Sequence, residues 1–240
     1  RIHGLMFVLG VFLFQRTHKI SFTVWNGAYA SFKFKTFALL SYKMKQEFNA
    51  DYWQNRYQLG QTGWDVGAIT PPLRDYFDQL PNTGQRILVP GCGNAYEAEY
   101  LFRKGFVHTY VADVAEAPLQ RFSERVPDFP KDQLLLQDFF QLNDQFDLII
   151  EQTFFCAIDP KLRSDYARQC AELLLPGGKL VGLLFDTAFE HAGPPFGGSS
   201  EEYRTYFEPY FEFLHFETAY NSIPPRQGRE LFMELRKREV

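Results

Sequence analysis

The chain has 240 residues, of which 45 % are hydrophobic and 18 % aromatic, so it can fill a sizeable core and its composition excludes a disordered protein. Its formal net charge of -4 provides no basic surface of the kind that nucleic acid needs. The 3 cysteines give neither a disulfide framework nor a zinc-ligand spacing, which favours a reducing compartment such as the cytoplasm.

The first 43 residues fit neither a folded domain nor a targeting signal. Residues 5–14 form an apolar run, which is too short for a membrane span of about 20 residues. A signal peptide is cleaved close after such a run, whereas the candidate site Ala28-Tyr29-Ala30 lies far beyond it. We therefore expect residues 1–43 to be an N-terminal extension outside the working domain, without a membrane segment. A cytoplasmic extension with a role of its own is the alternative.

Orderly patterns begin at Met44 and predict one α/β domain over 44–240. In chain order, apolar spacing and the positions of proline and glycine predict helices at 47–57 and 70–80, a strand at 86–89, a helix at 95–104, a strand at 109–112, a helix at 116–124, strands at 134–136 and 146–150, a helix at 159–175, a strand at 180–185, a helix at 201–210, and strands at 211–220 and 231–235. Strands that alternate with helices predict a mostly parallel sheet with helices on both faces.

The clearest helix is expected to begin at Asp159, which suits the N-cap, with Pro160 in the first turn. Pro176-Gly177-Gly178 is expected to end it before the strand at 180–185. The strand at 180–185 is continuously apolar, as is typical of a strand buried between two helical layers.

Ligands of open α/β sheets bind outside the carboxyl ends of the strands. Gly91 and Gly93 follow the strand at 86–89 and precede a helix, so a ligand can approach the backbone closely there. The alternative is an ordinary tight turn. Asp113 closes the next strand, 22 residues after Gly91, at the spacing of a carboxylate that accepts hydrogen bonds from ribose hydroxyls. Its alternative is a helix cap or a loop residue.

Two cofactor classes share this pattern. A dinucleotide fingerprint requires a third glycine or alanine three residues after the second glycine, but the chain has Tyr96 there, which would crowd a pyrophosphate. S-adenosylmethionine has no phosphates and does not need that close approach. The S-adenosyl cofactor is therefore favoured over NAD.

Five fragments in the same order resemble the thiopurine S-methyltransferase family, with the plant thiol and halide methyltransferases close in character. They are Trp64-Asp65-Val66-Gly67, Val89-Pro90-Gly91-Cys92-Gly93, Glu151-Gln152-Thr153-Phe154-Phe155-Cys156-Ala157-Ile158, Gly193-Pro194-Pro195-Phe196 and Ile223-Pro224-Pro225-Arg226-Gln227-Gly228. The resemblance covers 44–240. It implies a class I methyltransferase (Rossmann-like) three-layer sandwich, with a mostly parallel seven-stranded sheet and an antiparallel C-terminal hairpin.

The resemblance also implies a set of cofactor contacts. The expected contacts are Trp53 and Trp64 covering the cofactor, Tyr57 where relatives often have another tryptophan, Gly91 with Gly93 beside its amino-acid end, Asp113 at the ribose, Asp138 and Phe139 at the adenine, and Gln152 where plant relatives have a tyrosine. Aromatic faces suit a sulfonium cation, by about 0.5–2 kcal/mol each. Packing of these aromatic residues in the core is the alternative.

The acceptor is expected to contact Phe154, Phe155 and Phe196 as an apolar wall, and Arg226 as a fixed cation. Core packing and a solvated loop arginine are the respective alternatives. No general base and no metal ligand are assigned, since a thiol is already partly ionised and a halide has no proton to lose. Cys156 is interpreted as structural.

These patterns predict an enzyme that transfers a methyl group from S-adenosylmethionine to a small soft nucleophile: a thiol, a thiopurine-like compound or a halide. The alternatives are a non-catalytic nucleoside-binding regulatory protein of the same fold and a nicotinamide-dependent dehydrogenase. We expect a small-molecule acceptor and neither a nucleic-acid nor a membrane partner. The sequence leaves the oligomeric state open and is compatible with a monomer.

Overall fold

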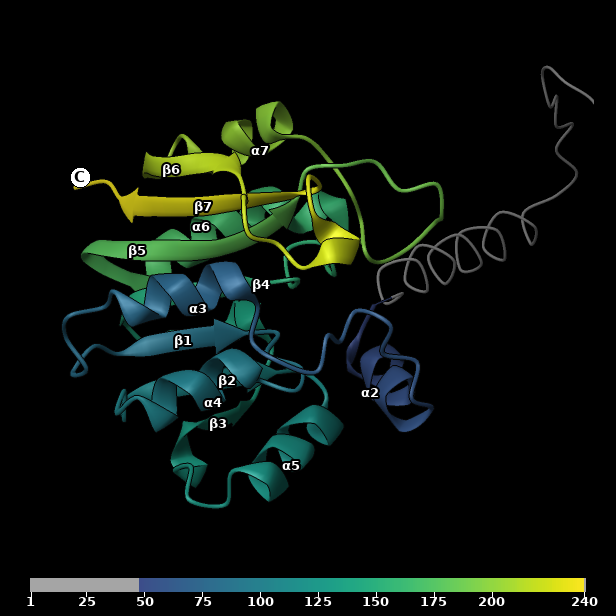
Figure 1. Cartoon of the computed structure of the whole chain (residues 1–240), viewed down its shortest axis with the longest axis vertical. Coiled ribbons are helices and arrows are strands. Elements are labelled where there is room, and N and C mark those ends of the chain that lie inside the picture. The colour runs from purple at the N-terminus through teal and green to yellow at the C-terminus, as the bar shows by residue number, and fades with distance from the viewer. Residues whose placement is uncertain (1–47, 240) are drawn as a thin grey trace, which may run out of the picture. The chain divides into compact units, whose positions relative to one another are not determined.

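The computed structural model describes residues 48–239, so the expectations for 1–43 lie outside the described residues. Seven strands form one sheet in the order β3-β2-β1-β4-β5-β7-β6 (Figure 1). They are β1 (Ile87–Pro90), β2 (Thr109–Asp113), β3 (Leu134–Leu136), β4 (Phe146–Gln152), β5 (Leu174–Phe185), β6 (Phe211–Thr218) and β7 (Glu230–Lys237). β1 to β5 pair in parallel, and β7 runs antiparallel to both β5 and β6. The predicted parallel sheet with an antiparallel C-terminal hairpin is confirmed.

Helices occupy the predicted connections, with boundaries shifted by a few residues. They are α2 (Ala50–Gln58), α3 (Pro71–Asp78), α4 (Tyr96–Arg103), α5 (Glu116–Arg125), α6 (Arg163–Leu173) and α7 (Ser200–Phe207), with the 3-10 turns η1 (Lys131–Gln133), η2 (Phe139–Gln141), η3 (Pro160–Leu162) and η4 (Pro224–Arg226). Two of the α-helices have a side-chain N-cap: Asn49 accepts a hydrogen bond from the first turn of α2, and Ser199 does the same for α7.

Strand periodicity builds a separate apolar core on each face of the sheet. In β4, Ile149 packs into a core with residues of α6 and α7, whereas Leu148 and Ile150 pack into a core with residues of α3, α4 and α5. Successive strand residues face opposite sides, so a continuously apolar strand serves both cores. The result is the three-layer sandwich that the sequence predicts.

Two predicted boundaries are wrong for local reasons. The helix expected from Asp159 begins with the 3-10 turn η3, which Asp159 caps through the amide of Lys161, and becomes α-helical only at Arg163. Pro176-Gly177-Gly178 does not separate helix from strand, because β5 already begins at Leu174. The pairing of β4 with β5 is irregular at this point, so the exposed Pro-Gly segment is a bulge within the strand.

The sheet order places the chemistry at one point. β1 and β4 are neighbours in the sheet. The strands that follow them, β2 and β5, lie on opposite sides of this pair, and such a switch point in strand order is where ligands of these sheets bind. The register of Leu88 opposite Ile149 brings Gly91, just beyond β1, level with Gln152, the last residue of β4. Among residues 48–239, no helix is long and apolar enough to cross a membrane.

Candidate active site

The turn between β1 and α4 has a left-handed backbone at Gly91 and Gly93, with φ of 54° and 51°. Glycine adopts this conformation without steric cost. A Cβ atom at Gly91 would lie 2.2 Å from a ring carbon of Phe154, so the ring packs directly on the backbone. The Gly93 amide donates a hydrogen bond to Asp113 Oδ2 at 3.1 Å. The two glycines and the carboxylate are therefore brought together, as the sequence predicts.

Asp113 is 7 % exposed at the end of β2. Its Oδ1 accepts a hydrogen bond from the Ala115 amide at 2.9 Å, while Oδ2 accepts from Gly93. Burial raises the pKa of Asp113 to about 6, against the lowering effect of the backbone donors. The group is thus mostly ionised at pH 7, and each oxygen keeps a lone pair for a ribose hydroxyl. Because Asp113 occupies the Gly93 amide, that donor is not free for a pyrophosphate.

Three aromatic rings stand beside this turn. Trp64 makes edge contacts with Trp53 at a centroid distance of 5.5 Å and with Tyr57 at 5.8 Å. The Tyr57 hydroxyl would lie 2.8 Å from a Cβ atom at Gly93, and burial together with Asp113 raises the pKa of Tyr57. The structure thus brings the three predicted covering residues together. Whether their faces contact the cofactor stays a prediction.

The loop that carries Trp64 is held from two sides. Arg226 Nη2 donates to the Trp64 carbonyl at 2.6 Å, and Asn94 Nδ2 donates to Asp65 Oδ2 at 2.5 Å. Arg226 is 8 % exposed, and its Nη1 also pairs with Glu230 Oε1 at 3.1 Å. The predicted contact of Arg226 with the acceptor stays a prediction, but the structure shows that its charge already has a carboxylate partner. No sequence pattern signals the bond from Arg226 to the Trp64 carbonyl, which spans 162 residues.

The remaining predicted cofactor residues lie at the ends of β3 and β4. Asp138 is half-buried and accepts a hydrogen bond from the Phe140 amide at 3.0 Å. The Phe139 ring is buried and contacts the rings of Phe154 and Tyr166 at 5.4 and 5.3 Å. The Gln152 Oε1 is buried without a hydrogen-bond partner among the described residues, so it can accept one from a ligand. The roles of Asp138, Phe139 and Gln152 stay predictions.

Glu151 shapes the segment that follows β4. Its Oε1 accepts hydrogen bonds from the amides of Phe154 and Phe155 at 2.7 and 2.9 Å, and its Oε2 accepts one from the Tyr166 hydroxyl at 2.6 Å. Burial raises the pKa of Glu151 to about 7, and the donors oppose that rise. The carboxylate that closes the strand therefore fixes where the two phenylalanines lie.

The predicted acceptor wall is divided by the structure. Phe155 is 1 % exposed and packs in the core against Tyr166 and Tyr203, both at 5.2 Å. Phe196 instead lines a cavity of about 580 Å³. The sequence analysis did not select Arg163, which is buried and holds the Phe196 loop by donating to the Gly197 carbonyl at 2.9 Å. The sequence signal that could have indicated a special role for Arg163 is its position as a basic residue in the first turn of a helix whose other face is apolar.

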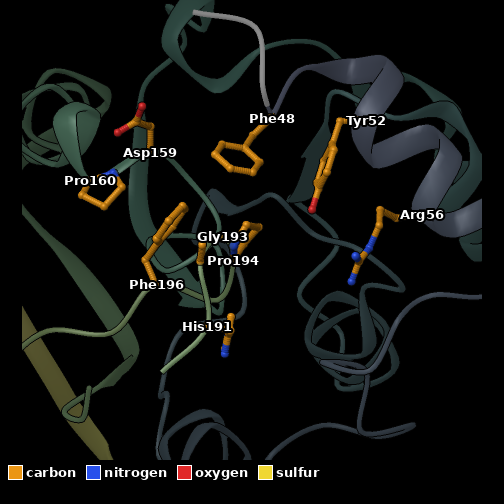
Figure 2. A pocket seen from close by; sticks show the side chains of 10 residues that line it. Phe48, Tyr52, Arg56, Asp159, Pro160, His191, Gly193, Pro194 and Phe196 are labelled. Carbon is orange, nitrogen blue, oxygen red and sulfur yellow. The ribbon is translucent and has the colours of Figure 1, made fainter. Parts of the chain in front are cut away.

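The cavity adds residues that the sequence analysis did not assign to the site. Figure 2 shows Tyr52 and Arg56 of α2 on one side and Asp159 with Pro160 on the opposite side. Phe48, Phe196 and the segment 191–194 complete the lining, and the rings of Phe48 and Phe196 meet at 5.5 Å. The sequence shows the helical spacing of Phe48, Tyr52 and Arg56, but it does not show that the helix face they share borders a cavity.

Cysteine and metal chemistry find no support in residues 48–239. Cys92, Cys156 and Cys170 are buried and unpaired, and burial raises the pKa of the Cys156 thiol. No group of His, Cys, Asp and Glu side chains in this part of the chain is arranged to hold a metal ion.

The chain matches the family model described as thiopurine S-methyltransferase over residues 48–236. A probable thiol methyltransferase 2 from Arabidopsis thaliana is 31 % identical over 80 % of this chain and 87 % of the relative. Thiocyanate methyltransferase 1 from Brassica oleracea is 31 % identical over 74 % of this chain and 81 % of the relative. A thiopurine S-methyltransferase from Vibrio cholerae is 26 % identical over 65 % and 80 %.

Solved structures resemble the fold at low identity. The 1,6-didemethyltoxoflavin-N1-methyltransferase of Burkholderia thailandensis, with bound S-adenosylhomocysteine, has a TM-score of 0.63 at 14 % identity, covering 91 % of this chain and 94 % of that chain. The magnesium protoporphyrin IX methyltransferase of Synechocystis PCC 6803 has a TM-score of 0.61 at 14 % identity, covering 79 % and 95–97 %.

The sheet order, the strand-end site and these matches define a class I S-adenosylmethionine-dependent methyltransferase. Within that class, the chain belongs to the thiopurine S-methyltransferase family. The predicted family, fold and cofactor are confirmed.

Glu151→Gln should change how stability depends on pH. The glutamine oxygen can still accept from both backbone amides, and Tyr166 can accept from the new amide. Because the folded protein binds the Glu151 proton more tightly than the unfolded chain, wild-type stability falls as pH rises from about 4.5 to about 7, the range over which the pKa of Glu151 is raised. The variant lacks this loss, so its free energy of unfolding relative to wild type should rise by up to about 3 kcal/mol over the window and then level off.

Urea unfolding of the variant and of wild type at pH 5 and pH 8 measures this difference in the free energy of unfolding. The other buried carboxylates are the same in both proteins, so their contributions cancel. Glu172→Gln, at an exposed glutamate of α6, is the matched control and should show no such trend. A difference between Glu151→Gln and wild type that is the same at both pH values would contradict the raised pKa.

Proposed function

We propose that this methyltransferase acts on a small soft nucleophile, namely a thiol, a thiopurine-like compound or a halide. The observation that carries the proposal is the match of residues 48–236 to the family model, together with relatives named for thiol, thiocyanate and thiopurine acceptors. The aromatic cavity beside α2 supports an apolar acceptor. When bound, S-adenosylmethionine supplies a methyl group on a positively charged sulfur, which an acceptor atom takes by direct in-line displacement.

The residues at the strand ends fit the cofactor by their donor and acceptor chemistry. Asp113 would accept from the ribose hydroxyls, and the partnerless Gln152 Oε1 would accept from a cofactor donor. Gly91 has no room for a side chain and would lie beside the amino-acid end. Gly93 would contribute to the same end, and Asp138 with Phe139 would hold the adenine.

The aromatic residues around the site would provide orientation and exclude water. Trp53, Tyr57 and Trp64 would cover the cofactor with ring faces that favour a cation. Phe154 and Phe196 would restrict where the acceptor can lie, and orientation of this kind supplies about 7–11 kcal/mol in the best intramolecular models. Phe155 would act from the core behind them.

We further propose that the enzyme works in the cytoplasm on a small-molecule acceptor, without nucleic acid or membrane. The buried, unpaired cysteines and the net charge of -4 support this setting.

S-adenosylhomocysteine should raise the melting temperature of the protein, and NAD should not. At one hundred times the dissociation constant, a ligand adds about 2.7 kcal/mol to stability, or about 5–10 °C for a domain of this size. Asp113→Ala removes the expected ribose acceptor and should abolish most of this shift, whereas Asp132→Ala, at an exposed aspartate, should retain it. The measurement is differential scanning fluorimetry, with circular dichroism to verify the fold of each variant. A full shift in Asp113→Ala would refute its cofactor role, and a shift with NAD alone would refute the methyltransferase assignment.

Thiols should be methylated in preference to amines and alcohols, with rates that follow ionisation of the free thiol. A thiol of pKa near 8.5 is a few per cent ionised at pH 7, whereas an alcohol needs its proton removed during attack. Initial rates across pH, with thiols of different pKa, should level off at the pKa of each thiol. The cavity contains His191, so His191→Gln is the control that asks whether a protein base contributes. Efficient methylation of an amine with thiols inert would overturn the acceptor class.

We propose that the working domain is 44–240. A chain shortened to begin at Met44 should bind S-adenosylhomocysteine as tightly as the full chain, because the proposed cofactor contacts begin at Trp53. Isothermal titration calorimetry on both chains measures this. Loss of binding or of solubility in the shortened chain would place residues 1–43 within the domain.

A further inference from the structure

The cavity beside α2 contains a cation that no carboxylate of the described residues neutralises. Arg56 lies half-buried on the cavity wall, and none of its nitrogens makes an ion pair within residues 48–239. The one hydrogen bond of its side chain within this part of the chain runs from Nε to the Gln61 carbonyl at 3.1 Å. Its two terminal nitrogens therefore retain their donors for a ligand.

Two aromatic rings hold the Arg56 guanidinium in place. It stands over the Trp64 ring at 5.3 Å and over the Tyr52 ring at 5.9 Å. A planar guanidinium stacked in this way loses little freedom when it binds a carboxylate through two hydrogen bonds. Because Trp64 is also the proposed cofactor cover, Arg56 lies where the acceptor and cofactor sites adjoin.

Arg226 differs from Arg56 in its burial, its ion pairing and the use of its donors. Its guanidinium is buried, pairs with Glu230 at 3.1 Å and stacks over the Phe185 ring at 5.4 Å. Its other assigned donor goes to the Trp64 carbonyl at 2.6 Å. A buried pair of opposite charges attracts a third charge only weakly, so Arg226 is suited to position Trp64 rather than to attract an anion.

The size and the charges of the cavity indicate what it takes. About 580 Å³ is in the range of pockets for organic ligands and far exceeds the need of a halide. Phe48 and Phe196 offer an apolar wall, and Asp159 lies on the side opposite Arg56 (Figure 2), where its Oδ1 accepts from the Lys161 amide. An anionic group on the acceptor would therefore be attracted to the Arg56 side and repelled from the Asp159 side.

We infer that Arg56 is the specificity-determining cation of the acceptor site and selects organic thiols that carry a carboxylate, while Arg226 is a positioning residue that acts through Trp64. This inference rests on the proposed function, because it assumes that the cavity receives the methyl acceptor.

A matched pair of acceptors and a set of matched variants test the inference. The acceptors are 4-mercaptobenzoate and 4-mercaptobenzamide, which have similar shape and differ in charge. The variants are Arg56→Gln, Arg56→Lys and Arg226→Gln, with Arg103→Gln, at an exposed arginine of α4, as control. For each protein we would measure kcat/KM with both thiols and the dissociation constant of S-adenosylhomocysteine. We would also measure the tryptophan fluorescence of Trp64, defined as the part of the emission that is lost in Trp64→Phe.

The ratio of interest is kcat/KM for 4-mercaptobenzoate divided by kcat/KM for 4-mercaptobenzamide. Arg56→Gln should lower this ratio by about tenfold, which corresponds to about 1.4 kcal/mol. Arg56→Lys should restore part of the ratio, since the charge remains and the planar fork is lost. Arg226→Gln should lower kcat/KM for both thiols alike, weaken S-adenosylhomocysteine binding and shift the Trp64 fluorescence. If that variant does not fold, the double variant Arg226→Gln/Glu230→Gln removes both charges and should show the same pattern. Arg103→Gln should leave the ratio unchanged.

An unchanged ratio in Arg56→Gln, or a loss of ratio in Arg226→Gln instead, would overturn the assignment of the two arginines. Failure of the proposed function looks different, because the wild type would then methylate neither thiol while it still binds S-adenosylhomocysteine. That outcome would overturn this inference together with the acceptor class.

Discussion

Glu151 accepts three hydrogen bonds at the carboxyl end of β4, and the geometry of the site follows from them. The amides of Phe154 and Phe155 and the hydroxyl of Tyr166 all donate to this one carboxyl group. The segment after β4 is thereby held so that the Phe154 ring lies on Gly91. Two residues further on, the Cys156 carbonyl accepts from the Phe196 amide at 2.7 Å, which ties the cavity wall to the same segment.

Two opposing effects meet at this carboxyl group. Complete burial disfavours its charge, and three donors favour it, so its pKa is raised only to about 7. An apolar residue of similar size would avoid the cost of desolvation but would leave the amides of Phe154 and Phe155 without their acceptor. The backbone therefore needs an acceptor at this position, and Glu151 supplies it. Asp113, at the end of β2 and two strands away from β4 in the sheet, shows the same balance of burial against hydrogen-bond donors, with two amides as its donors.

The sequence predicts those parts of the fold that short-range patterns encode. Apolar runs locate all seven strands, and the strand ends locate Gly91, Gly93 and Asp113, whose proximity the structure confirms. Pro176-Gly177-Gly178 was misjudged because the same residues serve as a helix stop and as a strand bulge, and only pairing with β4 decides between them.

Contacts across long sequence distances were not predictable in this way. The pairing of Arg226 with Glu230 is short-range, but its bond to the Trp64 carbonyl depends on how the last turn packs against the loop after α2. Likewise, the spacing of Arg56 places it on a helix face without stating that the face borders a cavity. Periodicity specifies which residues share a surface, whereas the partner of that surface is set by tertiary packing.

The distribution of charge around Trp64 reconciles two requirements that conflict electrostatically. A sulfonium cofactor is repelled by a nearby free guanidinium, whereas an anionic acceptor is attracted by one. Two unit charges at 4 Å interact by about 4 kcal/mol at an effective dielectric constant of 20, so an unpaired arginine on the cofactor side would weaken cofactor binding substantially. Glu230 cancels the charge of Arg226 at the point where Arg226 supports the Trp64 backbone. The unpaired guanidinium of Arg56 instead stands over the Trp64 ring at 5.3 Å and lines the cavity, where its charge can act on the acceptor.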